Sequence, residues 1–241
     1  MQKFNKAKKN NNTRVKIKKT HLVFLILFGV LLIDQILKFW IKTNMYIGQE
    51  YHILGDWFII HFTENEGMAF GMSFGGNWGK LFLSLFRVVA IGGLFWYIFK
   101  LLKEGVQTGY LVCITLITAG ATGNLIDSAF YGLIFDHSSY QIATFLPEGG
   151  GYAPFLHGHV VDMFYFPIIN GHWPEWIPFI GGDSFQFFRP VFNIADASIT
   201  TGILTLIIFF HKTALLELND KKTEDTELPQ DLKENKEERI S

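Results

Sequence analysis

The stretch VFNIADASITTGILTLIIFFH, residues 191–211, joins a membrane-spanning run to a carboxylate at its start. Residues 197–210 carry no charge and are rich in Ile, Leu and Phe, as in a helix that crosses a bilayer. Asn193 and Asp196 precede that run, and a charged side chain in a membrane helix is costly unless it is paired, hydrated or protonated. The stretch therefore predicts a membrane protein in which Asp196 has partners elsewhere in the chain.

Other segments are also apolar enough for a crossing, which takes about 20 residues. The predicted helices are residues 21–41, 81–99, 109–127 and 190–211, with outer loops at 42–80 and 128–189. Of the 241 residues, 49% are hydrophobic, and the mean hydropathy is +0.22. We therefore expect a mainly α-helical membrane domain over residues 21–211. No small-x-small cleavage site follows the first run, so we expect a retained anchor and not a signal peptide.

The charges are distributed unevenly along the chain and predict its orientation. Residues 1–20 hold eight basic side chains and no acidic one, whereas nine acids and five bases follow from Glu217 onward. Basic residues beside a span stay in the cytoplasm, so four crossings leave both termini inside and both long loops in the periplasm. The acidic tail, residues 212–241, is predicted to be disordered. The single Cys113 excludes an intramolecular disulfide.

The outer loops contain signs of local structure. Residues 51–71, YHILGDWFIIHFTENEGMAFG, alternate and are rich in aromatic and β-branched residues, which predicts short strands. We expect a small β-sheet, a cradle, at the outer membrane face. The segment WPEWIPFIGG, residues 173–182, is predicted to be an interfacial loop and not a helix.

Polar side chains from distant parts of the chain are predicted to meet at one depth near the outer face. They are Asp34, Lys38, Asn124, Asp127, Asp162, Asn193 and Asp196. If the last helix begins at residue 190, Asp196 lies about six residues inside it, roughly 9 Å deep at 1.5 Å per residue. Asp162, in GHVVDMFYF, has apolar neighbours on both sides.

Several of these residues have an ordinary structural interpretation. Asp34 and Lys38 are four apart on one helix face, as in a structural ion pair near the interface. Asn124 and Asn193 are typical of residues that hydrogen-bond between membrane helices.

Further polar residues also have structural alternatives. As a structural alternative, Asp127 lies at a helix end and faces water. Arg87, in the second helix, contacts one of the acids or a lipid phosphate. His157 and His159 precede Asp162 by five and three residues, which allows a His-His-Asp metal site. Histidines two apart without further ligands are more often ordinary loop residues, so we expect no metal.

Asp162 and Asp196 fit a structural role least well, because neither has a basic neighbour in the sequence. Two carboxylates that face each other in an apolar site cannot both ionise easily and share a proton. The ionised member then takes a proton from water, and the protonated one gives a proton to a leaving amide nitrogen. This arrangement predicts an aspartic peptidase. The alternatives are a small transporter or proton pathway and a membrane protein whose acids are structural; the first would place ionisable groups near the midplane.

Five short motifs follow one another along the chain: DQILK (34–38), NEGMAFG (65–71), GNLID (123–127), GHVVDMF (158–164) and FNIAD (192–196). Their order resembles that of the lipoprotein signal peptidase family, also called signal peptidase II, of the bacterial inner membrane. The resemblance implies an endopeptidase that cuts prolipoproteins before the cysteine that carries diacylglycerol. It also implies an active site near the periplasmic face, inhibition by globomycin, and neither a cofactor nor a nucleic-acid partner; a monomer is the simplest expectation.

The resemblance also implies a role for each matching residue. Asp162 and Asp196 match the catalytic pair. The residues implied to line or order the site are Asn65, Asn124, Asp127 and Asn193. Asp34 and Lys38 are implied to be structural, and we place Arg87 with them.

The chain departs from the family pattern in two respects. An arginine commonly follows the family's GNxxD motif, whereas Ser128 stands at that position here. We expect the absence of this arginine to alter substrate positioning and inhibitor affinity but not the catalytic pair. The outer segments 133–157 and 168–187 are longer than in compact members and are candidates for a lid or a partner surface.

Overall fold

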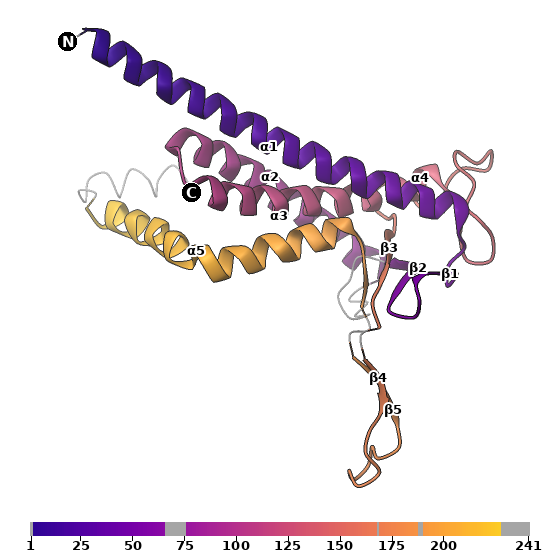
Figure 1. Cartoon of the computed structure of the whole chain (residues 1–241). Coiled ribbons are helices and arrows are strands. Elements are labelled where there is room, and N and C mark those ends of the chain that lie inside the picture. The colour runs from indigo at the N-terminus through magenta and orange to yellow at the C-terminus, as the bar shows by residue number, and fades with distance from the viewer. Residues whose placement is uncertain (1, 66–75, 168, 188–189, 228–241) are drawn as a thin grey trace. The chain divides into compact units, whose positions relative to one another are not determined.

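The computed structural model describes residues 2–65, 76–167, 169–187 and 190–227 (Figure 1). The helices are α1 (Gln2–Asn44), α2 (Gly76–Glu104), α3 (Thr108–Ile126), the π-helix η2 (Asp127–Tyr131), the short α4 (Gly132–Ile134) and α5 (Ile194–Glu227). The strands are β1 (Glu50–Leu54), β2 (Phe58–Asn65), β3 (Val160–Tyr165), β4 (Ile169–His172), β5 (Ser184–Phe187) and β6 (Val191–Phe192). The chain divides into two compact units, Met1–Gly202 and Ile203–Ser241, and the site described below lies within the first.

The prediction of four membrane-crossing helices is confirmed. The stretches long and apolar enough to span are Lys18–Asn44, Ser84–Glu104, Thr108–Ile134 and Ile194–His211. The third is longer than predicted because η2 and α4 continue it. The fourth begins four residues later than predicted, at Ile194 instead of residue 190, because Val191 and Phe192 belong to β6. Asp196 is therefore the third residue of its helix and not about six residues inside it, which corrects the predicted depth.

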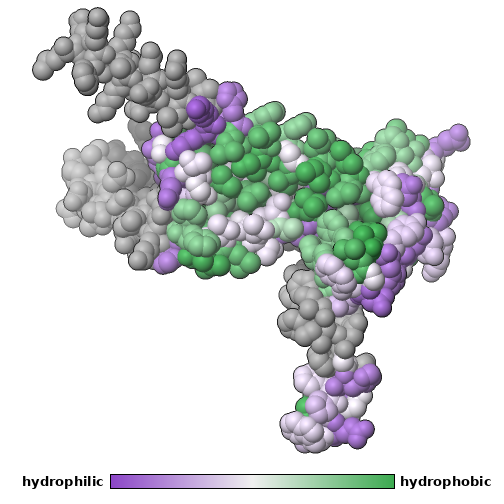
Figure 2. Space-filling model, in the orientation of Figure 1, coloured by the Kyte–Doolittle hydropathy of each residue, from purple (hydrophilic) through white to green (hydrophobic). Residues whose placement is uncertain are grey.

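The spanning helices expose large apolar side chains where a water-soluble protein would place polar ones. Figure 2 shows a broad hydrophobic surface over α1. Strongly exposed members on α1 and α2 are Phe24, Leu25, Phe28, Phe82, Phe86, Val89, Trp96 and Phe99. Contiguous apolar surface of this extent is expected to face lipid.

Small residues let α3 and the start of α5 approach closely. A β-carbon on Gly120 would overlap the carbonyl oxygen of Ala195 and lie 2.7 Å from Cγ1 of Ile199. A β-carbon on Gly123 would lie 2.8 Å from Oδ2 of Asp34. Lipid tails are as apolar as leucine, so membrane helices associate through such close packing and through hydrogen bonds.

The segments that connect the membrane helices form a four-stranded antiparallel sheet in the order β1-β2-β3-β6. The prediction of strands after residue 51 is confirmed as far as Asn65, whereas residues 66–71 lie outside the described part of the chain. In the β2–β3 pair, Thr63 lies opposite Asp162. The sheet thereby brings Asp162 to the end of the helices at which α5 begins.

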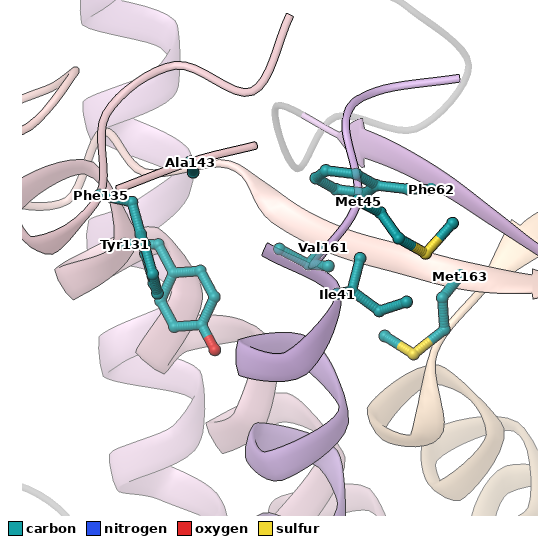
Figure 3. Close-up of a cluster of buried hydrophobic side chains, with 8 residues drawn as sticks. All are labelled: Ile41, Met45, Phe62, Tyr131, Phe135, Ala143, Val161 and Met163. Carbon is teal, nitrogen blue, oxygen red and sulfur yellow. The ribbon is translucent and has the colours of Figure 1, made fainter. Parts of the chain in front are cut away.

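A hydrophobic cluster fixes the face to which Asp162 points (Figure 3). Its buried members are Ile41, Met45, Phe62, Tyr131, Phe135, Ala143, Val161 and Met163. Val161 and Met163 flank Asp162 on β3, and side chains alternate between the two faces of a strand. Because the flanking pair packs into this cluster, the Asp162 carboxylate lies on the opposite face, toward the start of α5.

Helix α5 extends beyond the last span: residues 212–227 continue it, whereas residues 228–241 lie outside the described residues. The disorder expected for the tail stays a prediction. Ala214, Leu215, Leu216 and Leu218 are good helix formers. A helix that already exists extends readily, because the costly nucleation step has been made in the span.

We predict that Gly120→Ala destabilises the protein by about 1–3 kcal/mol, the cost of overpacking a close contact. The added methyl group would overlap the Ala195 carbonyl, so α3 and α5 must move apart. The measurement is the thermal unfolding midpoint of the purified protein in detergent. Gly93→Ala on α2 is the matched control, because a β-carbon there meets no atom within 4 Å. Equal midpoints for both variants would contradict the close approach.

Candidate active site

The beginning of α5 is held by a reciprocal pair of hydrogen bonds between Asn193 and Asp196. The Asp196 backbone N–H donates to Oδ1 of Asn193 (2.9 Å), and the Asn193 backbone N–H lies 3.4 Å from Oδ2 of Asp196. This is a capping box, in which the N-cap and N3 residues satisfy each other's free N–H groups. The three-residue spacing in FNIAD thus fixes the rotamer of the Asp196 carboxylate.

Asn193 also holds the second carboxylate. Its Nδ2 donates to Oδ1 of Asp162 at 2.7 Å and to the Val161 carbonyl oxygen at 3.2 Å. Asn193 is fully buried, and Asp162 is only 4% exposed. One amide side chain therefore sets the position of Asp162 relative to the first turn of α5.

The environment of Asp162 favours its protonated form. Burial has the largest effect, and together with the negative charge of Asp196 it raises the pKa of Asp162 to about 7. The Lys38 charge and the hydrogen bond from Asn193 oppose this shift without cancelling it. Asp162 is therefore suited to hold a proton near neutral pH.

The Asp196 carboxylate is held from α3 as well. Nδ2 of Asn124 donates to Oδ1 of Asp196 at 2.7 Å. The orientation of that amide is fixed on its other side, because Oδ1 of Asn124 accepts from Nζ of Lys38 at 3.0 Å and from Nδ2 of Asn193 at 3.2 Å. A chain of polar contacts thus runs from Lys38 through Asn124 to Asp196.

Lys38 is the centre of a fully buried ionic cluster. Its Nζ lies 2.9 Å from Oδ2 of Asp34 and 2.7 Å from Oδ2 of Asp127, and none of the three side chains is exposed to solvent. The predicted i,i+4 pair is present, but it lies in the protein interior and also includes Asp127. The alternative in which Asp127 faces water is wrong, since its side chain is completely buried.

The two acids of this cluster also bind backbone groups of β3 and α5. Oδ1 of Asp34 accepts from the Ala195 N–H at 2.9 Å, and Oδ2 of Asp127 accepts from the Val161 N–H at 3.3 Å. Ala195 and Val161 are the residues directly before Asp196 and Asp162. The cluster therefore anchors both segments one residue from each candidate carboxylate.

Gln35 belongs to the same network, although sequence reasoning did not identify it. Its Nε2 donates to Oδ1 of Asp127 at 2.9 Å and to Oδ2 of Asp34 at 3.1 Å, and its Oε1 accepts from the Tyr131 hydroxyl at 3.3 Å. The sequence feature that could have identified Gln35 is its polar amide within a mostly apolar span.

Arg87 points toward the site from α2. Its Nη1 lies 3.5 Å from Oγ of Ser128, and its charge acts on Asp196 and Asp127. Arg87 was expected to meet an acid, and the structure gives a longer-range electrostatic attraction to Asp196 and Asp127. Ser128, where an arginine was expected from the resemblance, is itself a neighbour of this guanidinium.

Asn65 ends β2 and lies opposite Val160 in the register, two residues from Asp162. It is exposed. The rest of its motif, residues 66–71, is outside the described residues.

The two loop histidines serve different contacts. Nδ1 of His157 lies 3.0 Å from the Phe155 carbonyl oxygen, and Nδ1 of His159 lies 3.1 Å from Oε2 of Glu64. Burial acts to raise the pKa of Glu64, but the hydrogen bond with His159 and the Lys42 ammonium outweigh it and hold that pKa below its ordinary value. Within the described ranges no group of three or more His, Cys, Asp and Glu side chains is arranged to hold a metal ion.

Comparisons with known proteins agree on one family. A family model described as signal peptidase (SPase) II matches residues 26–212. The chain is 51% identical over 195 residues to the lipoprotein signal peptidase of Porphyromonas gingivalis, covering 80% of this chain and 84% of that protein. It is 36% identical over 199 residues to the lipoprotein signal peptidase of Amoebophilus asiaticus, covering 81% and 79%.

The fold is similar to that of a solved bacterial membrane enzyme whose structure was determined by the in meso method at 1.9 Å resolution. The TM-score is 0.53 at 26% sequence identity, and the match covers 80% of this chain and 94% of the solved one.

We predict that Lys38→Met destabilises the protein by about 3–5 kcal/mol, because it leaves two buried carboxylates without their counter-charge. Thermal unfolding in detergent measures this loss. Lys100→Met is the matched control: Lys100 forms a partly exposed pair with Glu104 at 3.3 Å, and such pairs contribute about 0–1 kcal/mol. Similar midpoints for the two variants would show that the Lys38 cluster does not hold the fold together.

Proposed function

The chain belongs to the signal peptidase II family, and from this premise we propose that Asp162 and Asp196 are its catalytic pair. The protein is an aspartic-type membrane peptidase that cleaves the signal peptides of lipoproteins. The transporter alternative is not favoured. The observation that carries the assignment of the pair is that two amides, the buried Asn193 and the half-buried Asn124, each hold one of the carboxylates at the outer ends of the helices.

The surroundings assign a different role to each aspartate. Asp162 is the more buried and has the raised pKa, so it holds the shared proton. Asp196 accepts hydrogen bonds from the Asn124 amide and the Asn193 backbone N–H, which suits the ionised member. Asp196 is thus the general base and Asp162 the general acid.

The hydrolysis then follows from these roles. Asp196 takes a proton from a water molecule, whose oxygen attacks the carbonyl carbon of the scissile peptide bond. When the carbon–nitrogen bond of the resulting tetrahedral intermediate breaks, Asp162 gives its proton to the leaving nitrogen. The pair ends with the proton on Asp196, and transfer of that proton to Asp162 restores the initial state.

The substrate is a prolipoprotein, and the finer assignments extend the resemblance. We place the cut before the cysteine that carries diacylglycerol, whose acyl chains remain in lipid while the peptide reaches the pair. Asn65 grips the substrate backbone from the end of β2. Globomycin as inhibitor and a monomeric enzyme are carried over as expectations.

The proposed orientation has both termini in the cytoplasm and the active site near the periplasmic face. The basic N-terminus supports it. Lys19 donates hydrogen bonds to the carbonyl oxygens of Gly105 and Val106, so the basic end of α1 and the α2–α3 link lie at the same end of the helices. Residues 21–211 then form the peptidase domain between the N-terminal segment 1–20 and the tail 212–241.

We predict that Asp162→Asn and Asp196→Asn each abolish cleavage, with losses of at least about 10³-fold, because each amide can neither give nor take the required proton. The assay is cleavage of a diacylglyceryl-modified prolipoprotein in detergent. Asp56→Asn is the matched control, since the Asp56 side chain is 92% exposed, and it retains full activity.

Each variant is first compared with the wild type by thermal unfolding, so that a loss of folding is not counted as a loss of chemistry. Substantial activity in either folded variant would remove that residue from the catalytic pair.

We further predict that kcat/KM falls above about pH 7, by about tenfold per pH unit. The pKa of Asp162 is raised to about 7, so a rise in pH through this value removes the proton that must be given to the leaving nitrogen. The measurement is the cleavage rate as a function of pH at substrate concentrations well below KM, where the rate reports the pKa of the free enzyme. A constant rate up to about pH 9 would exclude Asp162 as the proton donor.

A further inference from the structure

In the sequence, strands β4 and β5 come between β3 and β6, and they form a two-stranded hairpin that is separate from the four-stranded sheet (Figure 1). Ile169, Asn170, Gly171 and His172 pair with Phe187, Gln186, Phe185 and Ser184. The hairpin does not hydrogen-bond to the four-stranded sheet within the described residues. Its tip, residues 173–183, contains the segment WPEWIPFIGG.

The tip has a definite fold of its own. The Trp173 N–H donates to the Asp183 carbonyl oxygen, and the Gly182 N–H donates to that of Trp173, both at 2.9 Å. Within this closed pair, the Ile177 N–H donates to Pro174 and the Gly181 N–H to Ile177. A β-carbon on Gly181 would lie 2.6 Å from the Glu175 carbonyl oxygen, so the turn is packed too closely for another residue.

This folded tip turns its largest apolar side chains outward. Trp176 is 81% exposed, and Phe179 is fully exposed at 103%. Phe179 has a φ of 71°, a left-handed conformation that is unfavourable for a bulky residue. Strain of this kind persists where the surrounding structure enforces it and is concentrated at functional positions. The tip thus uses backbone strain to display an aromatic ring that does not contribute to its own packing.

The connections of the hairpin place its base beside a membrane span. Pro190 and β6 follow β5, and the last spanning stretch begins at Ile194. Phe166, at the base, stacks on Phe58 with ring centroids 4.8 Å apart and lies 5.8 Å from Phe192. A row of aromatic rings thus joins the sheet, the base of the hairpin and the start of α5.

The composition of the tip matches the interface between lipid and water. Tryptophan is enriched at that interface because its ring is apolar and its N–H remains hydrated. The charged residues Glu175 and Asp183 border the apolar ones, and the tip is far too short to span the hydrocarbon.

We propose that the hairpin tip, through Trp176, Phe179 and Ile180, inserts into the lipid–water interface of the leaflet in which α5 begins. The hairpin then forms a lipid contact of the outer segment in addition to the four spans. This inference does not depend on which residues perform the hydrolysis.

The first test measures the depth of a nitroxide spin label on the full-length protein in phosphatidylethanolamine–phosphatidylglycerol nanodiscs. The label is attached to Phe179→Cys in a Cys113→Ala background, and its collisions with oxygen and with a water-soluble nickel complex are compared. Val89→Cys, 74% exposed on α2, is the lipid reference, and Glu148→Cys, on an exposed loop, is the water reference. Each labelled protein must retain cleavage activity.

The expected result is an oxygen-to-nickel ratio at Phe179 several-fold above that at Glu148 and closer to that at Val89. A ratio equal to that at Glu148 would overturn the proposal. Protection of the Phe179 label from both reagents would also overturn it, in favour of a protein that covers the tip.

A second test leaves every cysteine in place. Brominated lipid quenches tryptophan fluorescence at short range, so the emission of Trp176 itself, taken as the difference between the wild type and Trp176→Phe, should be strongly quenched. If that difference is the same in brominated and unbrominated lipid, Trp176 lies outside the lipid and the proposal is overturned.

Discussion

The buried ammonium of Lys38 is the constraint on which the rest of the site depends. Asp34 and Asp127 are both completely buried beside it, with a carboxylate oxygen of each within 3 Å of the ammonium. Oδ1 of Asp34 accepts from the N–H of Ala195, and Oδ2 of Asp127, the oxygen that also contacts Lys38, accepts from the N–H of Val161. One positive charge on α1 therefore determines how α3, β3 and α5 meet. A buried ionic cluster contributes little net stability compared with an apolar core, so its value here lies in fixing geometry, which hydrophobic contacts alone define less sharply.

The first turn of α5 caps its helix and carries one member of the proposed catalytic pair. Asp196 closes the capping box with Asn193, so its carboxylate is held in place before any substrate binds. Asn193 completes the cap and also binds Asp162. The usual cost of burying polar side chains is offset because, among the described residues, the buried side-chain donors and acceptors have partners, and the same bonds orient the two carboxylates. The proposed role of the N3 carboxylate is therefore compatible with a stable helix start.

Much of the fold could be predicted from the sequence, because its signals are local. Apolar runs of sufficient length identified the four spans, and alternation after residue 51 identified β1 and β2. The start of α5 was placed four residues too early, since the apolar residues Val191 and Phe192 suit a span as well as they suit a strand. β3 was not predicted, because an apolar run around Asp162 does not show that it pairs with β2, about 100 residues earlier in the chain.

The site was predictable to the extent that its residues stand out by type. Acids and amides near apolar runs identified the catalytic candidates and the ligands of Lys38. Gln35 was missed because it is adjacent to Asp34 in sequence and, at about 100° per residue, is not expected on the same helix face. Its long side chain nevertheless reaches both Asp34 and Asp127. The burial of Asp127 could likewise not be predicted, because whether an acid at a helix end faces water depends on which parts of the chain pack over it.

The different positions of the two aspartates support the distinct roles proposed for them. Asp196 lies in the first turn of a helix, beside free N–H groups and the positive end of the aligned peptide dipoles. Asp162 lies on a strand, which offers no comparable dipole, and its most direct support is the single amide of Asn193. Two chemically identical groups thus stand in different surroundings, because one carboxylate is placed at a helix start and the other on a strand. The proposed division into acid and base rests on this asymmetry.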